Sequence, residues 1–227
     1  MILRITLLQR LDGMTPAAFE RYWLDVHAPL AARLQGLSLY HLNAVRATAG
    51  SHAMESLPLW PVDGIAQLGF ADFEAMKSAG STAAGKADRV NFIKLQQTLV
   101  CRRGSGEDGP AQEGRLAKCM VFLCRPRGIT AAQFEEAWLR GPSVSPASQR
   151  GGMVARVRNL VVDRWPEPWV SASYEAMPVD GVEELWFDSD AAMAAFTADL
   201  RNPSRPDRRD HVEGELVLGL EAHRVIG

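Results

Sequence analysis

The stretch PVDGIAQLGFADFEAM (Pro61–Met76) recurs later in the chain as PVDGVEELWFDSDAAM (Pro178–Met193). The two copies are identical at eight of sixteen positions, where average composition predicts about one. Upstream of each copy, MTPAAFERYWL (Met14–Leu24) and ITAAQFEEAWL (Ile129–Leu139) are identical at six of eleven positions. The offsets, 117 and 115 residues, are nearly equal. The chain of 227 residues is therefore predicted to contain one unit twice.

The segment between the copies has the composition of a linker. GSGEDGPAQEG (Gly104–Gly114) is rich in glycine and acidic residues and contains no large apolar side chain, which is typical of a surface connection. We expect an N-terminal domain at residues 1–104, a linker at 105–114 and a C-terminal domain at 115–227.

Hydropathy predicts the same order of elements in both copies. In the first copy, strands are expected near 3–7, 39–47, 65–70 and 94–103, and helices after Thr15-Pro16 and over 72–84. The second copy repeats the opening with a strand at 119–124 and a helix with a capping box, Thr130–Gln133. Each βαββαβ unit of this α+β fold makes a four-stranded antiparallel sheet with two helices on one face. The simplest cover for the other face is the second copy.

The composition excludes several classes of partner. A formal net charge of −2, from 25 basic and 27 acidic residues, gives no general attraction to nucleic acid. We see no apolar stretch long enough to span a membrane and no signal-peptide layout at the N-terminus. The three cysteines form no CxxC pair, so free thiols and a cytoplasmic location are expected.

Two long loops interrupt the predicted units. About sixteen residues separate the second and third strands of each copy, at 48–63 and 163–180, which is longer than most connections in compact domains. They carry large apolar side chains, among them Trp60, Trp165 and Tyr174. Two interpretations stay open: flaps that lie over the protein, or plain interface with the linker or the other copy.

His27 is the candidate for chemistry. It follows Trp23 by one turn at the edge of the apolar helix face, and Pro29 predicts that the helix kinks or ends there. A histidine with a near-neutral pKa beside an apolar cavity can act as a general acid or base. From the pattern alone a structural role is the more common one for a lone histidine.

The run F-x-x-Y-W-x-x-x-H-x-P-L (Phe19–Leu30), followed by Gly36-Leu37, Tyr40-x-x-Asn43 and DGIAQLGF (Asp63–Phe70), resembles an EthD-type domain of the dimeric α+β barrel group. The resemblance covers essentially the whole first copy. The second copy departs from it where the histidine should be: Gly141-Pro142-Ser143-Val144 replaces Val26-His27-Ala28-Pro29. The site is therefore expected in the N-terminal half alone.

This resemblance implies two ferredoxin-like repeats packed as one intramolecular barrel, in a monomer or a homodimer. It implies a pocket for a small hydrophobic, often aromatic molecule between sheet and helices, and reactions such as cyclisation, decarboxylation, dehydration or cofactor-free oxygenation. His27 would be the acid/base, Tyr40 a hydrogen-bond donor and Asn43 an orienting group. The expected substrate contacts are Tyr22, Trp23 and Trp60. No cofactor and no metal are required.

Tyr40 and Asn43 lie three residues apart, so an unbroken strand places them on opposite faces. We favour Tyr40 for the pocket, and we expect a cavity of roughly 300 Å³ or more touching His27 and Tyr40.

Two other functions remain open. In one, the barrel is a non-catalytic module that binds a hydrophobic ligand or assembles with a partner. In the other it binds haem, with His27 as an axial ligand. The spacing of His27, His41 and His52 matches no metal motif.

Overall fold

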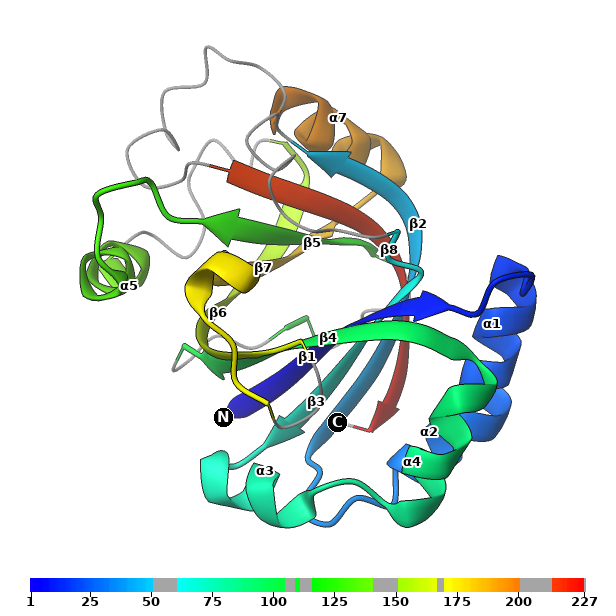
Figure 1. The fold of residues 1–227 in the computed structure, drawn as a ribbon. Coiled ribbons are helices and arrows are strands. Elements are labelled where there is room, and N and C mark those ends of the chain that lie inside the picture. Colours follow the sequence, from blue (N-terminus) through cyan, green and yellow to red (C-terminus); the bar gives the residue numbers. More distant parts are fainter. Residues whose placement is uncertain are drawn as a thin grey trace.

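The computed structural model describes residues 1–50, 61–104, 109–110, 116–140, 151–166, 170–200 and 214–226. Eight antiparallel strands close into a barrel in the order β1-β3-β2-β8-β5-β7-β6-β4 (Figure 1). The strands are β1 (Ile2–Arg10), β2 (Leu39–Gly50), β3 (Gly64–Phe70), β4 (Ile93–Arg103), β5 (Ala117–Cys124), β6 (Met153–Trp165), β7 (Gly181–Phe187) and β8 (Gly214–Ile226). The expectation of an α+β barrel is confirmed.

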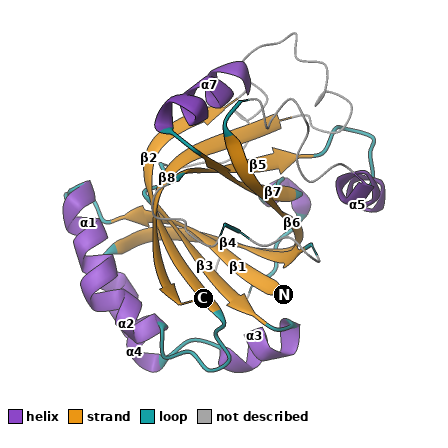
Figure 2. Cartoon of the chain, turned by 180° about the vertical axis from the view of Figure 1, so that it is seen from behind, coloured by secondary structure: helices purple, strands orange, loops and turns teal. Residues whose placement is uncertain are grey.

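The helices lie outside the barrel (Figure 2). They are α1 (Pro16–Tyr22), the π-helical turn η1 (Trp23–His27), α2 (Ala28–Ala31), α3 (Phe73–Ala79), α4 (Ala83–Asp88), η3 (Arg89–Asn91), α5 (Ala131–Arg140), η5 (Tyr174–Ala176) and α7 (Asp190–Leu200). α1 to α4 flank the sheet of β1 to β4, and α5 and α7 flank the other sheet. Among the described residues, none of these helices is long and apolar enough to cross a membrane.

Local sequence signals explain where the helices begin. The Thr15 side chain accepts a hydrogen bond from the Ala18 amide, and Pro16 takes the first helical position. At α5, the Thr130 amide donates to the Gln133 side chain and the Gln133 amide donates to Thr130 Oγ1, which is the predicted capping box.

Pro29 does not end its helix. The Ala28 amide donates to the carbonyl of Trp23, five residues back, so the chain makes one π-helical turn and continues as α2. A π turn changes which carbonyls the following amides reach, and this accommodates a residue that has no amide hydrogen. The predicted helix over 72–84 also differs, because it is divided into α3 and α4 at Gly80, whose φ of 57° lies in the left-handed region.

The buried residues form three clusters. One fills the barrel interior with side chains of both halves, including Ile5, Leu99, Phe122 and Leu218. The second lies between the first sheet and α1 to α3, and the third between the second sheet and α5 and α7. The first loop lies mostly in 51–60, so Trp60 is outside the described residues.

A polar network crosses the barrel interior. Lys118 Nζ lies 3.1 Å from a Glu184 carboxylate oxygen and donates to Gln67 Oε1 on the opposite sheet. Arg103 also donates to Glu184. Burial alone would raise the pKa of Glu184, but Lys118 and Arg103 outweigh it and hold that pKa well below its usual range.

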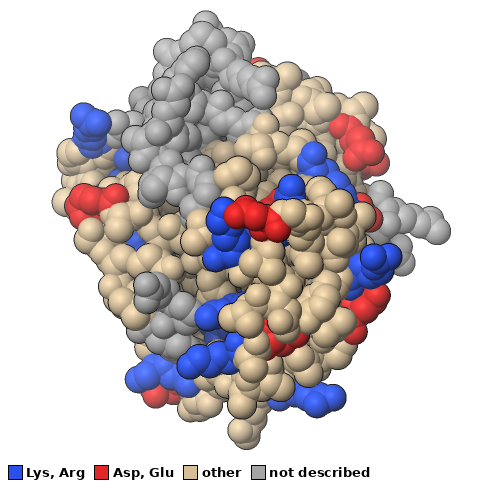
Figure 3. Space-filling model, turned by 45° about the vertical axis from the view of Figure 1, so that its right-hand side comes forward, with Lys and Arg blue, Asp and Glu red and all other residues tan. Residues whose placement is uncertain are grey.

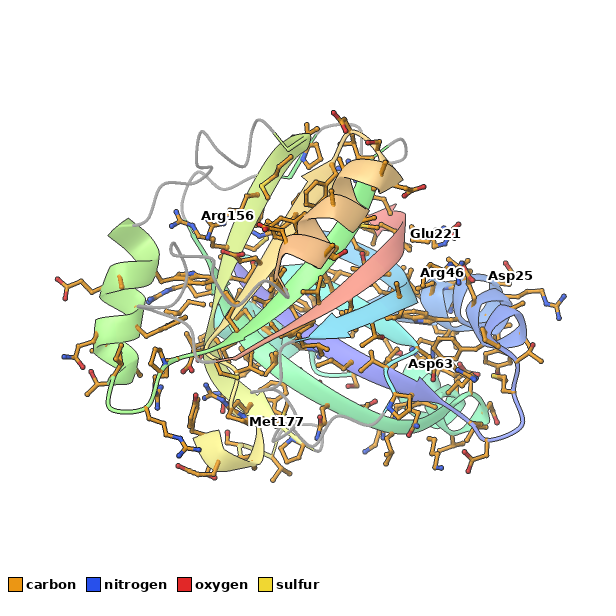
Figure 4. The ribbon with its side chains drawn as sticks, turned by 90° about the horizontal axis from the view of Figure 1, so that it is seen from above. Asp25, Arg46, Asp63, Arg156, Met177 and Glu221 are labelled. Atoms are coloured by element: carbon orange, nitrogen blue, oxygen red, sulfur yellow. The ribbon has the colours of Figure 1, made fainter. Side chains whose placement is uncertain are left out.

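The repeated Asp-Gly pair has the same contacts in both halves. Asp63 accepts from the backbone amide of Arg10 at 2.9 Å and pairs with its guanidinium. Asp180 does the same with Arg125, at 2.8 Å from the amide and 2.7 Å from the guanidinium. These aspartates therefore hold strand ends together. Figure 4 labels Asp63 beside the barrel strands.

Candidate active site

A cavity of about 470 Å³ lies between the first sheet and its helices. β1, β3 and β4 form its floor, and α2, α4 and the residues before α4 form its sides. Its apolar lining includes Leu34, Leu68 and Trp165. A cavity of this size is typical of a small-molecule site.

The polar floor of the cavity comes from neighbouring strands. Thr6 on β1 stands directly opposite Thr98 on β4, and their hydroxyl oxygens are 2.9 Å apart in a buried hydrogen bond. Arg4, two residues earlier on the same face, donates to the carbonyl of Gly80 at 3.0 Å. Burial lowers the pKa of Arg4 to about 10, with a small opposing effect of Tyr40, so its guanidinium remains charged at neutral pH.

The charged side chains of the lining are all cationic. Lys86 from α4 and Arg89 from η3 join Arg4, and no carboxylate is among the described residues that line the cavity. Elsewhere the surface carries charges of both signs, as the face in Figure 3 shows.

One wall of the cavity comes from the C-terminal half. Trp165 ends β6, which pairs with β4 so that Trp165 stands opposite Thr98. The indole Nε1–H donates to Asp163 at 2.7 Å, and Ser171 donates to the same carboxylate oxygen at 2.9 Å. A residue of the second predicted loop thus lines the site of the first half.

His27 belongs to a hydrogen-bonded group beside this cavity. Its Nδ1 lies 2.9 Å from Asp88, which also accepts from the Tyr22 hydroxyl at 2.6 Å. The imidazole packs on Phe92, with ring centroids 4.8 Å apart. Burial lowers the pKa of His27, and Asp88 partly opposes this shift. Burial alone would raise the pKa of Asp88, but its hydrogen bonds from Tyr22 and His27 lower it overall.

The other predicted residues are separated by the strand alternation. Tyr40 faces the helices, is 1% exposed and packs in the same cluster as Trp23; burial raises its pKa well above the usual range. Asn43 faces the barrel interior, is fully buried and donates to Gln67 and to the carbonyl of Ile65.

The expected contact with both His27 and Tyr40 is not found at this cavity, because neither residue is part of its lining. His27 stands one helical turn before Ala31, and Asp88 directly precedes Arg89, and both Ala31 and Arg89 are lining residues. The His27–Asp88 pair therefore adjoins the cavity edge, while Tyr40 and Trp23 belong to the packed layer behind it.

Among the described residues, the wall of this cavity offers no typical ligand for haem iron. Protein ligands of haem iron are histidine, cysteine, methionine or tyrosine, and none of these is among the described residues of the cavity wall. A separate group, Glu20, Glu221 and His223, has metal-ligating atoms within 4.8 Å of one another. Arg46 already pairs with both Glu20 and Glu221 there, and Figure 4 labels Arg46 and Glu221.

Sequence reasoning missed Arg4, Thr98 and Trp165 as lining residues. The alternation of Arg4 and Thr6 with apolar residues was the available signal, but it indicates only a polar strand face. The partner strands, one of them from the other half of the chain, are set by long-range register.

Comparison with known proteins finds a family match within the first half of the chain. Residues 11–96 match the family model of the EthD domain. A linear gramicidin synthase of Brevibacillus parabrevis is 26% identical over 163 residues, which are 63% of this chain and 3% of that protein. This chain thus spans only a small part of the length of that synthase.

Solved structures resemble almost the whole chain. A candidate monooxygenase of Lactobacillus acidophilus NCFM has a TM-score of 0.55 and 12% identity, with 97% of this chain and 93% of that chain covered. An anthrone oxidase-like protein has a TM-score of 0.55 and 11% identity, with 98% of this chain and 92% of that chain covered. A chlorite dismutase variant of Candidatus Nitrospira defluvii has a TM-score of 0.51 and 9% identity, with 97% of this chain and 90% of that chain covered. At these identities the likeness shows the fold alone.

Proposed function

From the match of residues 11–96 to the EthD domain, we propose that the N-terminal half is a cofactor-free enzyme that transfers a proton to or from a small, largely apolar molecule. The substrate would lie in the 470 Å³ cavity, with His27 as the acid/base. The observation that carries the proposal is the His27–Asp88 hydrogen bond beside that cavity.

The proposal treats the chain as two ferredoxin-like units, residues 1–104 and 115–227, joined by 105–114 and packed as an intramolecular barrel. Equivalent contacts support the duplication. Asn43 donates to Gln67 and to the carbonyl of Ile65, and Asn159 donates to Glu184 and to the carbonyl of Val182. The second unit would serve as scaffold and as the source of Trp165.

Asp88 gives His27 the properties of a base. An ionised carboxylate only accepts hydrogen bonds, so Nδ1 carries the hydrogen and Nε2 of the neutral ring keeps its lone pair. Burial keeps the pKa of His27 low, so this neutral form is the main one at pH 7. The Tyr22 hydroxyl holds Asp88 from the other side, which fixes the orientation of the ring.

Cationic groups of the cavity would stabilise the product of deprotonation. Removal of a proton next to a carbonyl places negative charge on oxygen, and preorganised donors around that oxygen lower the energy of the transition state. Arg4 and the Thr6–Thr98 hydroxyl pair provide such donors on the cavity floor.

Hydrogen–deuterium exchange tests the proposed proton transfer. 2-Tetralone has acidic C–H groups next to its carbonyl, and its exchange in D2O is followed by NMR with and without protein. We expect the wild type to accelerate exchange over buffer and His27→Asn to lower that acceleration about 100-fold or more. His223→Gln is the control, since this histidine pairs with Glu20 and does not line the cavity. Equal rates in wild type and His27→Asn would contradict the proposal.

The alternative is a binding module without catalysis. It is favoured by one observation, that His27 does not line the cavity. This alternative predicts that the protein binds a small molecule in the cavity, accelerates no exchange, and keeps its ligand affinity in His27→Asn.

A further inference from the structure

The charge of the cavity indicates which molecules it accepts. Its lining contains Arg4, Lys86 and Arg89, and no carboxylate among the described residues. The carboxylate next to Arg89 in sequence, Asp88, is already bonded by Tyr22, His27 and Asn91. A ligand that brings a negative charge would thus meet three cations in the wall of the cavity and no like charge there.

The donors on the floor match a carboxylate. A guanidinium binds the two oxygens of a carboxylate through parallel N–H groups. In the Thr6–Thr98 pair one hydroxyl donates to the other, so the accepting threonine still has one O–H to donate. Arg4 and Thr6 are two residues apart on β1 and both line the cavity, so these donors are on one face of the strand.

The remaining lining matches a flat apolar ring. Trp165 is held by its hydrogen bond to Asp163 and forms one wall together with the apolar side chains Leu34 and Leu68. Aromatic rings pack favourably on a fixed indole. The ionic and apolar parts of the lining lie in one cavity of about 470 Å³, which accommodates a molecule that has both parts.

We propose that the cavity binds a planar aromatic carboxylate, with the carboxylate at Arg4 and the threonine pair and the ring against Trp165. This inference rests on the proposed function only in that both use the same cavity. The burial that lowers the pKa of Arg4 adds to the effect, because a desolvated cation interacts more strongly with an anion than an exposed cation does.

Calorimetric titration with 2-naphthoate and 2-naphthamide tests the charge requirement. The two probes share the same ring system, and only the first is an anion. We expect the affinity of the wild type for 2-naphthoate to exceed its affinity for 2-naphthamide by about tenfold or more. Arg4→Gln should remove this preference by weakening the acid and leaving the amide nearly unchanged. Arg21→Gln, on the exposed side of α1, changes the net charge equally and should keep the preference.

Because Arg4 is deeply placed, folding is checked by circular dichroism. If Arg4→Gln does not fold, the double variant Lys86→Gln/Arg89→Gln tests the same point and should reduce the preference. Equal affinity of the wild type for both probes, or binding of neither at millimolar concentration, would overturn the proposal. Exchange of 2-tetralone that needs His27, together with no preference for 2-naphthoate, would reject the ligand class and leave the proposed proton transfer standing.

Discussion

The indole of Trp23 lies against the backbone of Gly64, where an added Cβ would come within 2.4 Å of the ring. The second half repeats the arrangement, since a Cβ on Gly181 would lie 2.7 Å from the indole of Trp138. The glycine that follows Asp63 and the glycine that follows Asp180 thus each make room for a tryptophan of the helical segment packed on that part of the sheet. In both halves the helix therefore packs on the sheet through the same contact between a tryptophan and a glycine.

Gly64→Ala should therefore destabilise the protein by about 1–3 kcal/mol, because a methyl group is forced into a packed aromatic ring. Urea unfolding measures the change. Gly219→Ala is the matched control in a strand, because its Cβ would meet nothing closer than 3.4 Å. An unchanged unfolding midpoint for Gly64→Ala would show that the indole moves aside freely.

The ionic network inside the barrel gives a second prediction. Glu184 is 1% exposed and binds both Lys118 and Arg103. Glu184→Gln leaves two buried cations without their counter-charge, so we expect the free energy of unfolding to fall by about 3 kcal/mol or more. Glu135→Gln, which removes an exposed partner of Arg102, should cost about 1 kcal/mol or less. Similar losses in both variants would argue against an ionic role for Glu184.

These cases show which parts of the fold local sequence can predict. The caps at Thr15 and Thr130 depend on residues within three positions, and the chain repeats them in register. The βαββαβ order of elements followed from the same local periodicity. The network of Glu184 could not be predicted, because Lys118 and Gln67 reach it from other strands and a charged residue in a strand normally faces water.

The candidate site was predictable only in part. The helix motif placed His27 next to a cavity, but its partner Asp88 lies 61 positions away on a helix that the pattern had merged with its neighbour. One cross-strand pair of the described residues also differs between the two halves. Arg158 stands opposite Glu183 on β6 and β7, where Leu42 and Ala66 stand opposite each other on β2 and β3. Such pairing is visible only after the register is known.

Acid sensitivity provides a third prediction. His41 is 6% exposed, and burial together with Lys118 lowers its pKa to about 4. Between pH 6.5 and about pH 4 the unfolded chain binds a proton at His41 and the folded chain does not. The contribution of the neutral His41 to stability is therefore fully present above pH 6.5 and is lost as the pH falls to about 4. Over this pH range we expect the free energy of unfolding to fall by about 3 kcal/mol.

His41→Gln should flatten this part of the pH profile of urea unfolding. Glu184 raises the pKa of His41, and Lys118, Arg103 and Arg224 lower it, so the comparison needs a variant that leaves these charges in place. The free energy of unfolding of each protein is therefore compared with its own value at about pH 8, where His41 is neutral in both the folded and the unfolded chain. An equal pH slope in both proteins would contradict the prediction.

The His27–Asp88 pair predicts how activity depends on pH. Burial lowers the pKa of His27 and Asp88 raises it, so exchange of 2-tetralone should be constant above about pH 6.5 and decrease at lower pH as the ring is protonated. Asp88→Asn removes the raising effect and should shift the decrease to lower pH. Tyr22→Phe keeps the Asp88 carboxylate and should not lower the pKa of His27. NMR titration of the His27 imidazole measures that pKa directly. A shift to higher pH in Asp88→Asn would be inconsistent with this pair.

Substitution of Trp165 tests how much the C-terminal half contributes to ligand binding in the cavity. Trp165→Ala removes a cavity wall, so the affinity for 2-naphthoate should fall about tenfold, while circular dichroism keeps the signature of the barrel. Asp163→Asn replaces the acceptor of the indole N–H and should cause a smaller loss, because the ring stays but is held less firmly. Val162→Ala is the control on the same strand, with a side chain that is 46% exposed. If Trp165→Ala binds 2-naphthoate as the wild type does, Trp165 contributes no binding energy to the cavity, and the C-terminal half supports the site only by completing the barrel.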